Sequence, residues 1–489
     1  MRSIIARHFK NNAFLGNATI STMTTMLQGL ANLITVIYLA RTLAPTAYGT
    51  FSYTWAFTVI FGFLTSLGIP IFLTRQLSRD ADHATDIVSY GITLMIWMSL
   101  VVMIFFMIAV QIIPGLVHYR VLFDWWSIIF LQMGLNPQWI FSALQRLWIP
   151  MTINFGGTVL RLGLTIGLVH SPRDLVVAVI VTVSTLVVPL IVEFVWLHRL
   201  VKYRLIRFPW IRGQRTILQS LPMGVISFVG VLYTGVDTWI LHSVIGSRAV
   251  GYYTAGYRPI SFLATMSGIY FNLAYPLLSR FIFKDFIKVR NFLRLATLVM
   301  LTVVLPAALG GDVVATALMR DAFGFRYISS GPVFAILIWS WSLSLLRDVF
   351  STALVAGNHE RTFAKLFASS GVINLGLMLI LVRWGPVGTA SALVITQGLL
   401  LVLNIWTVQR FHIFSLDYSL LKPLGKIMMN SGAMAVTVWV IQRYVALWID
   451  IVVGILLYMG LTMLTRVFPL KTLYELMKSK NDHEIGNMD

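Results

Sequence analysis

The run from Ile87 to Ile113 reads IVSYGITLMIWMSLVVMIFFMIAVQII and contains no charged residue. It is longer than the ~20 residues that an α-helix needs to cross the hydrocarbon core of a bilayer. The whole 489-residue chain has the same character, because 58% of its residues are hydrophobic and only 11% are charged. Soluble domains carry roughly 25% charged residues. The composition therefore excludes a water-soluble enzyme and predicts an all-α polytopic membrane protein.

Similar apolar segments, bounded by charged or turn residues, lie on both sides of this run. They predict 12–14 transmembrane helices, the thirteenth being the shortest. The expected ranges are 13–40, 47–73, 87–113, 123–144, 147–169, 175–197, 218–244, 250–278, 292–317, 330–355, 362–382, 388–408, 427–441 and 446–464.

An internal repeat divides the chain. The stretch Ala47–Tyr53 opens the second predicted helix, and Val250–Ala255 opens the eighth about 200 residues later. Six helices separate the two copies, so both halves have the same orientation and are expected to be related by a pseudo-twofold axis along the membrane normal. We therefore expect an N-lobe over residues 1–210, a C-lobe over 211–411, and two further helices with a tail over 412–489.

The distribution of Lys and Arg predicts the orientation. With a cytoplasmic N-terminus, 24 of these residues fall in cytoplasmic segments and 8 in external loops. The positive-inside rule then places both termini in the cytoplasm of a cell (inner) membrane. A net charge of +19 can indicate nucleic-acid binding in a soluble protein, but here it indicates contact with membrane lipids and no nucleic acid. The densest basic cluster comprises Arg199, Lys202, Arg204, Arg207, Arg212 and Arg215.

Three stretches resemble a known family. They are Leu39–Gly49 (LARTLAPTAYG), Asn136–Phe141 (NPQWIF), and Asp237 followed by Gly251–Arg258 (GYYTAGYR). In combination they are similar to the Wzx-type polysaccharide flippases of the MATE/MOP exporter superfamily. Peptidoglycan lipid flippases, a sister family, carry arginines in the first two helices, where this chain has uncharged residues such as Gln28 and Thr35. This difference argues against lipid II as the substrate.

The resemblance implies a flippase that moves a polyprenyl-pyrophosphate-linked oligosaccharide from the cytoplasmic to the outer leaflet by alternating access, for cell-surface polysaccharide biosynthesis. It implies a polysaccharide polymerase and chain-length proteins as further partners. One alternative is a MATE-type cation-coupled drug antiporter, which predicts an acidic cleft. Another is a membrane-embedded polymerase or ligase, which usually needs a large external loop that the sequence lacks.

Charges within the predicted spans mark the candidate site, since a charge at the centre of a membrane helix costs roughly 2.5–3.5 kcal/mol. Arg258 is the leading candidate, because the family has a basic residue at the matching cleft position and a guanidinium suits pyrophosphate. Arg161, Arg347 and Lys365 are expected to add positive charge. Asp237 is expected either to bind a coupling cation or to pair with Arg258. Arg347 and Asp348 are adjacent on a helix and so are expected to point ~100° apart, each pairing with another helix.

No enzymatic site is expected. The chain has no cysteine, which excludes disulfides, thiolate metal sites and cysteine nucleophiles. Its nine histidines are scattered without the spacing of metal ligands. The sequence therefore predicts no catalytic residue, no metal and no cofactor.

Overall fold

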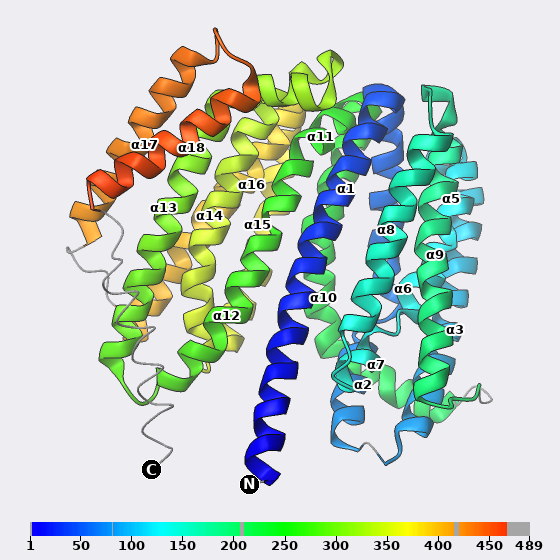
Figure 1. The fold of residues 1–489 in the computed structure, drawn as a ribbon. Helices are drawn as coiled ribbons and strands as arrows, with labels where there is room; N and C mark the ends of the chain where they lie inside the picture. The colour runs from blue at the N-terminus through cyan, green and yellow to red at the C-terminus, as the bar shows by residue number, and fades with distance from the viewer. Residues whose placement is uncertain (1, 81, 206–209, 415–419, 467–489) are drawn as a thin grey trace. The chain divides into compact units, whose positions relative to one another are not determined.

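The computed structural model describes residues 2–80, 82–205, 210–414 and 420–466. Arg207 of the basic cluster and the C-terminal tail from residue 467 lie outside the described residues. The chain folds almost entirely into helices (Figure 1). The α-helices are α1 (Arg2–Gly62), α2 (Ile69–Arg79), α3 (Ala84–Ile112), α4 (Pro114–Val117), α5 (Arg120–Ser127), α6 (Ile129–Leu135), α7 (Gln138–Ala143), α8 (Trp148–Leu168), α9 (Leu175–Leu200), α10 (Trp210–Ile245), α11 (Ser247–Leu263), α12 (Thr265–Phe281), α13 (Phe286–Leu318), α14 (Gly331–Ala356), α15 (Glu360–Leu381), α16 (Gly385–Arg410), α17 (Leu421–Ile441) and α18 (Leu447–Leu464).

Eight helical segments among the described residues are long and apolar enough to cross a membrane. Two of them, Met23–Thr65 and Glu360–Arg410, are 43 and 51 residues long. At 1.5 Å per residue each exceeds the ~30 Å hydrocarbon core about twofold, so each includes two of the expected spans. The all-α fold class is confirmed, and the shortest expected span, 427–441, is the 21-residue helix α17.

Three expected helices have internal breaks. The expected helix 47–73 is wrong as a single element, because a 3₁₀ turn and Gly68 (φ 79°) separate the end of α1 at Gly62 from the start of α2 at Ile69. The expected gap between 40 and 47 is a kink inside α1, where Ala44 is non-helical (φ 61°, ψ 166°) and Pro45 lacks an amide donor. The expected helix 123–144 is wrong as a single element: it is divided into α5, α6 and α7, with the last break at Asn136–Pro137. A break at Ala264 likewise divides 250–278 into α11 and α12.

Clustering of the chain gives two compact units. Unit 1 comprises residues 1–265, 322–327 and 371–392, and unit 2 comprises 266–321, 328–370 and 393–489. In unit 1, α3, α5, α8 and α9 run side by side (Figure 1), and one core is formed by buried side chains of α2, α3, α7 and α9. In unit 2, α12, α13, α14 and α16 form one core, and α13, α17 and α18 form another. The expected lobe boundaries at 210 and 411 stay a prediction.

The internal repeat has a direct structural role in unit 1. Gly49 of α1 and Gly251 of α11 occupy corresponding positions in the two copies, and their helices cross there in close contact. A Cβ atom at Gly49 would collide with the carbonyl oxygen of Ser247, and one at Gly251 with that of Pro45. Only glycine allows this approach, which brings α11 against α1 on one side of the cavity described below.

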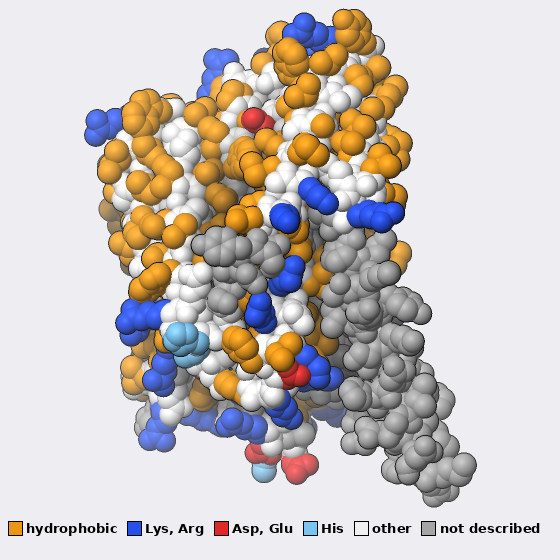
Figure 2. All heavy atoms as spheres, turned by 90° about the vertical axis from the view of Figure 1, so that its left-hand side faces the viewer, with side chains coloured by type: hydrophobic (Ala, Val, Ile, Leu, Met, Phe, Trp, Pro, Cys, Tyr) orange, Lys and Arg blue, Asp and Glu red, His pale blue; other side chains and the backbone are white. Residues whose placement is uncertain are grey.

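The surface is apolar, as a bilayer requires. Large hydrophobic side chains that are exposed include Val101 and Phe105 on α3 and Leu464 on α18. Figure 2 shows one face on which hydrophobic side chains predominate, with several Lys and Arg side chains toward its lower end. Exposed apolar area of this extent is unfavourable in water and normal where lipid is the solvent.

Candidate functional site

A polar stripe on α1 forms one wall of a cavity in unit 1. Thr25, Gln28, Asn32 and Thr35 are spaced by three or four residues and therefore lie on one face of an otherwise apolar helix. The cavity has a volume of about 380 Å³, within the range typical of small-molecule sites. Its other lining residues come from both parts of α1 and from α8, α9, α11 and α12: Gly29, Val36, Leu39, Phe51, Trp55, Thr158, Arg161, Thr182, Leu186, Arg258 and Thr265.

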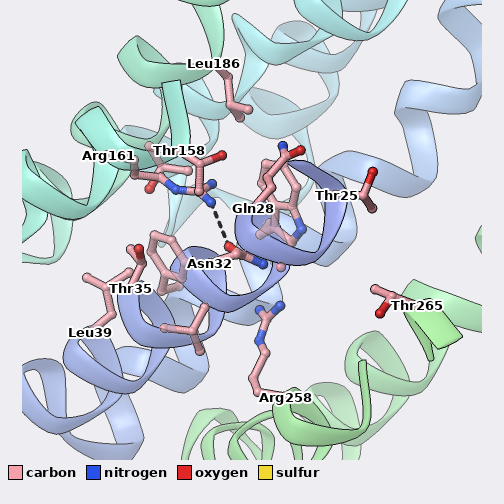
Figure 3. Close-up of a pocket in the computed structure, with 15 residues that line it drawn as sticks. Thr25, Gln28, Asn32, Thr35, Leu39, Thr158, Arg161, Leu186, Arg258 and Thr265 are labelled. Atoms are coloured by element: carbon pink, nitrogen blue, oxygen red, sulfur yellow. Dashed lines mark hydrogen bonds between the residues drawn. The ribbon is translucent and has the colours of Figure 1, made fainter. Parts of the chain in front are cut away.

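Two arginines give the cavity its charge. Figure 3 shows Arg161 of α8 and Arg258 of α11 directed toward the face of α1 that carries Asn32. None of the described residues that line the cavity is acidic. The cavity thus combines two guanidinium groups with hydroxyl and amide side chains, a donor-rich set that suits an anion with several oxygen atoms.

Neutral partners hold both guanidinium groups in place. Arg161 Nη2 donates a 2.6 Å hydrogen bond to Asn32 Oδ1, and its Nε is buried without a partner among the described atoms. Arg258 Nε donates a 3.1 Å hydrogen bond to the hydroxyl of Tyr48, which is fully buried. These contacts fix the positions of the two cations, and neither cation forms an ion pair with a carboxylate in the part of the chain that the structure describes.

Two carboxylates within the spans of unit 1, Asp237 and Glu193, have neutral partners. Asp237 accepts hydrogen bonds from the Tyr253 hydroxyl at 2.6 Å and from the Thr238 amide at 2.7 Å. Glu193, which is 2% exposed, accepts one from Asn154 Nδ2 at 2.7 Å. Among the described residues, no ion pair joins Asp237 to Arg258, because Arg258 extends into the cavity and Tyr253 occupies the carboxylate. The cation-binding role of Asp237 stays a prediction.

The other two expected cations belong to unit 2. Arg347 of α14 donates to Asp348 Oδ1 from Nη2 at 2.6 Å and to Gln397 Oε1 of α16 from Nη1 at 2.7 Å. The expectation that Arg347 and Asp348 do not meet is therefore wrong: the long, flexible arginine side chain bends back to its neighbour despite the ~100° offset. Lys365 is exposed on α15. Neither Arg347 nor Lys365 lines the cavity.

The sequence interpretation did not single out Asn32 and Tyr48, which position the arginines. A signal for Asn32 was present, since polar residues at positions 25, 28, 32 and 35 follow the helical period within an apolar span. Tyr48 lies inside the repeated motif, but nothing in one sequence indicates that its hydroxyl meets a residue 210 positions away.

Helices enclosing a polar, charged cavity define a multi-pass membrane protein of transporter architecture. The chain is similar in fold to a lipid II flippase, MurJ, in an inward closed conformation, with a TM-score of 0.73, 14% identity, and coverage of 92% of this chain and 99% of that one. It is also similar to an inward-facing multidrug resistance MATE family transporter, with a TM-score of 0.57, 16% identity and coverage of 79% and 94%. A third is a MOP superfamily transporter from Pyrococcus furiosus Vc1 described as having a binding pocket of reverse polarity (TM-score 0.50, 18% identity, coverage of 82% and 95%).

The fold is thus that of the MOP superfamily of exporters. The model of the family described as polysaccharide biosynthesis protein matches residues 14–282, more than half of the chain. The chain belongs to this family, and the resemblance drawn from its motifs is confirmed. No curated protein matches it in sequence.

Proposed function

We propose that this protein is a flippase that moves a polyprenyl-pyrophosphate-linked oligosaccharide from the cytoplasmic to the outer leaflet by alternating access. The observation that carries the proposal is the pair Arg161 and Arg258 in a cavity lined by no acid among the described residues. A pyrophosphate presents several charged oxygens, and guanidinium groups bind such oxygens with paired hydrogen bonds. The neighbouring hydroxyl and amide side chains suit sugar hydroxyls. Membership of a polysaccharide biosynthesis family supports the same substrate class.

The roles of the individual cations follow from their surroundings. We assign the pyrophosphate to Arg258 and Arg161, whose hydrogen-bond partners are neutral. The supplementary roles expected of Arg347 and Lys365 stay predictions, and variants discussed below test the first of them. A drug antiporter that takes cationic substrates is disfavoured, because a cation entering this cavity would meet two positive charges and no carboxylate among its described lining residues.

The cell membrane location, the cytoplasmic termini, and the polymerase and chain-length partners belong to the same proposal. The supporting observation is the excess of Lys and Arg in the segments assigned to the cytoplasm. Reporter fusions test it: a reporter at residue 207 or in the tail should be active in the cytoplasm, and one at residue 326 outside. An external signal at residue 207 would overturn the orientation.

Reconstituted vesicles test the transport activity. Purified protein is inserted into liposomes that contain a lipid-linked oligosaccharide in one leaflet, and its appearance in the other leaflet is followed with a membrane-impermeant lectin or glycosidase. We expect protein-dependent translocation that added cationic drugs do not inhibit. Translocation no faster than in empty liposomes, or uptake of a cationic drug instead, would contradict the proposal.

A further inference from the structure

A short segment between α13 and α14 is part of unit 1, although both of its flanking helices belong to unit 2. This segment, Ala322–Tyr327, is here called the strap. Its backbone is irregular: a π-helical turn ends at Phe323, Gly324 has φ 96°, and a 3₁₀ turn begins at Phe325. Short π-helical turns are rare in proteins, and those that occur are often found at functional sites.

Two hydrogen bonds attach the strap to α1. The Tyr327 hydroxyl donates to the carbonyl oxygen of Ala40 at 2.8 Å, and Arg41 Nε donates to the carbonyl oxygen of Ala322 at 2.6 Å. The attachment lies at the kink of α1, where Pro45 has no amide hydrogen to give to the preceding helical turn. The strap is thus bound to a part of α1 that is already interrupted.

This attachment lies at one end of the cavity. In the part of α1 before the kink, Leu39 is the last residue that lines the cavity. Ala40 and Arg41 come directly after it. In the predicted orientation, Arg41 and Arg326 both lie on the external side. The strap therefore covers α1 where the cavity would have to open outward.

A side-chain path joins the strap to the binding cations. Arg258 donates to the Tyr48 hydroxyl, and the ring of Tyr48 packs edge-on against the ring of Tyr327, with centroids 6.4 Å apart. The ring of Tyr252, on the same helix as Arg258, also packs edge-on against Tyr327 at 6.3 Å. Movement of the Arg258 side chain can thus displace Tyr327 through Tyr48, which contacts both residues.

We propose that the strap Ala322–Tyr327 is the external gate of the cavity, held shut by its bonds to Ala40 and Arg41, and that Tyr48 is a positioning residue that links occupancy of Arg258 to its release. The link between Arg258 occupancy and release of the strap rests on the proposed function, whereas closure of the cavity by the strap does not.

Cysteine accessibility tests the closure without any lipid substrate. The chain has no native cysteine, so Thr35→Cys provides a single probe in the cavity. A membrane-impermeant maleimide should label it poorly from outside in the parent. Adding Arg41→Gln and Tyr327→Phe should raise external labelling about tenfold, the expected result of losing one exposed and one buried hydrogen bond from the closed state.

Tyr458→Phe provides a matched control. It removes another buried tyrosine hydroxyl, which donates to the carbonyl oxygen of Thr302 at 2.9 Å within unit 2. It should leave external labelling of Thr35→Cys unchanged. Equal labelling with and without the strap substitutions, or an equal rise with Tyr458→Phe, would overturn the gate.

Cross-linking tests the same claim in the opposite direction and remains decisive if the weakened strap fails to fold. Arg41→Cys and Ala322→Cys are joined by a short reducible bis-thiosulfonate reagent, with each single cysteine as control. We expect translocation to stop in the cross-linked protein and to return on reduction. Failure of the pair to cross-link, or full translocation while cross-linked, would overturn the gate, whereas absent translocation before cross-linking would count against the proposed function instead.

Discussion

Both units hold an arginine inside a membrane-spanning helix, but the two are compensated in different ways. Arg347 of unit 2 has a carboxylate 2.6 Å away on Asp348, so the pair is neutral. In unit 1, Arg258 donates a hydrogen bond to the hydroxyl of Tyr48, and Arg161 donates one to the side-chain amide oxygen of Asn32. A charge held by neutral dipoles in low dielectric still attracts an opposite charge, whereas a charge held by a carboxylate does not. We therefore propose that the partner, more than the arginine itself, distinguishes a cation that binds substrate from one that is structural.

The largest effect is expected at Arg258. Arg258→Ala should lower translocation roughly 30-fold or more, because truncating one partner of a buried charged contact costs about 2–5 kcal/mol. Arg258→Lys should retain part of the activity, since the point charge survives and the paired hydrogen bonds are lost. The measurement is the vesicle translocation rate at matched protein level.

Asp237 provides the control for this change. The Asp237 carboxylate accepts a hydrogen bond from Tyr253 and not from Arg258. Adding Asp237→Asn should therefore not restore the activity of Arg258→Ala. Restoration would mean that the arginine serves only to neutralise that carboxylate.

A new carboxylate should make the cavity of unit 1 resemble the neutral pair of unit 2. Asn32→Asp places a negative charge where Arg161 now meets an amide, and we expect about tenfold weaker binding of the lipid-linked pyrophosphate. Asn32→Ala removes the hydrogen bond without adding charge and should cost about threefold. Equal losses in the two variants would show that positioning, rather than charge, is what Asn32 provides.

Breaking the pair in unit 2 should affect stability before transport. Arg347→Ala leaves Asp348 without its cation, and we expect a loss of about 2 kcal/mol in unfolding free energy, less than for a fully buried pair. The double variant with Asp348→Asn should recover most of it. Thermal unfolding in detergent measures both. A translocation loss as large as that of Arg258→Ala in the double variant would instead give Arg347 the substrate role expected from the sequence.

The smallest effect concerns a loop in unit 2, outside the spans. Asp285 caps α13, and hydrogen bonds from the Lys288 amide and ammonium lower the pKa of its carboxyl. A lowered folded pKa means that the stabilisation is present above the ordinary pKa and is lost as the pH falls through the folded value. Asp285→Asn should therefore change Tm by only about 1 °C at pH 7 and should flatten its fall below pH 4. An unchanged acid profile would contradict this role.

The sequence predicted most helices because twenty or more apolar residues have few other structures available in a bilayer. It predicted the break between 40 and 47 but not the one at Asn136–Pro137, because a proline can end a helix there and yet lie inside an unbroken one at Pro259 of α11. It singled out Arg258 and Arg161 from the cost of a buried charge, and both line the cavity of unit 1. The sequence did not predict the hydrogen bond from Tyr253 to Asp237 or the ion pair between Arg347 and Asp348. Side-chain pairing of this kind depends on tertiary positions that sequence spacing alone does not encode.

Equilibrium binding tests the central claim most directly. A radiolabelled polyprenyl-pyrophosphate oligosaccharide is titrated against purified protein in nanodiscs, using the parent, Arg258→Ala, and the double variant Arg347→Ala with Asp348→Asn. We predict that Arg258→Ala raises Kd roughly 30-fold while the double variant stays within about threefold of the parent. Unchanged Kd in Arg258→Ala, or an equal rise in the double variant, would contradict the assignment of the substrate to the cationic cavity of unit 1.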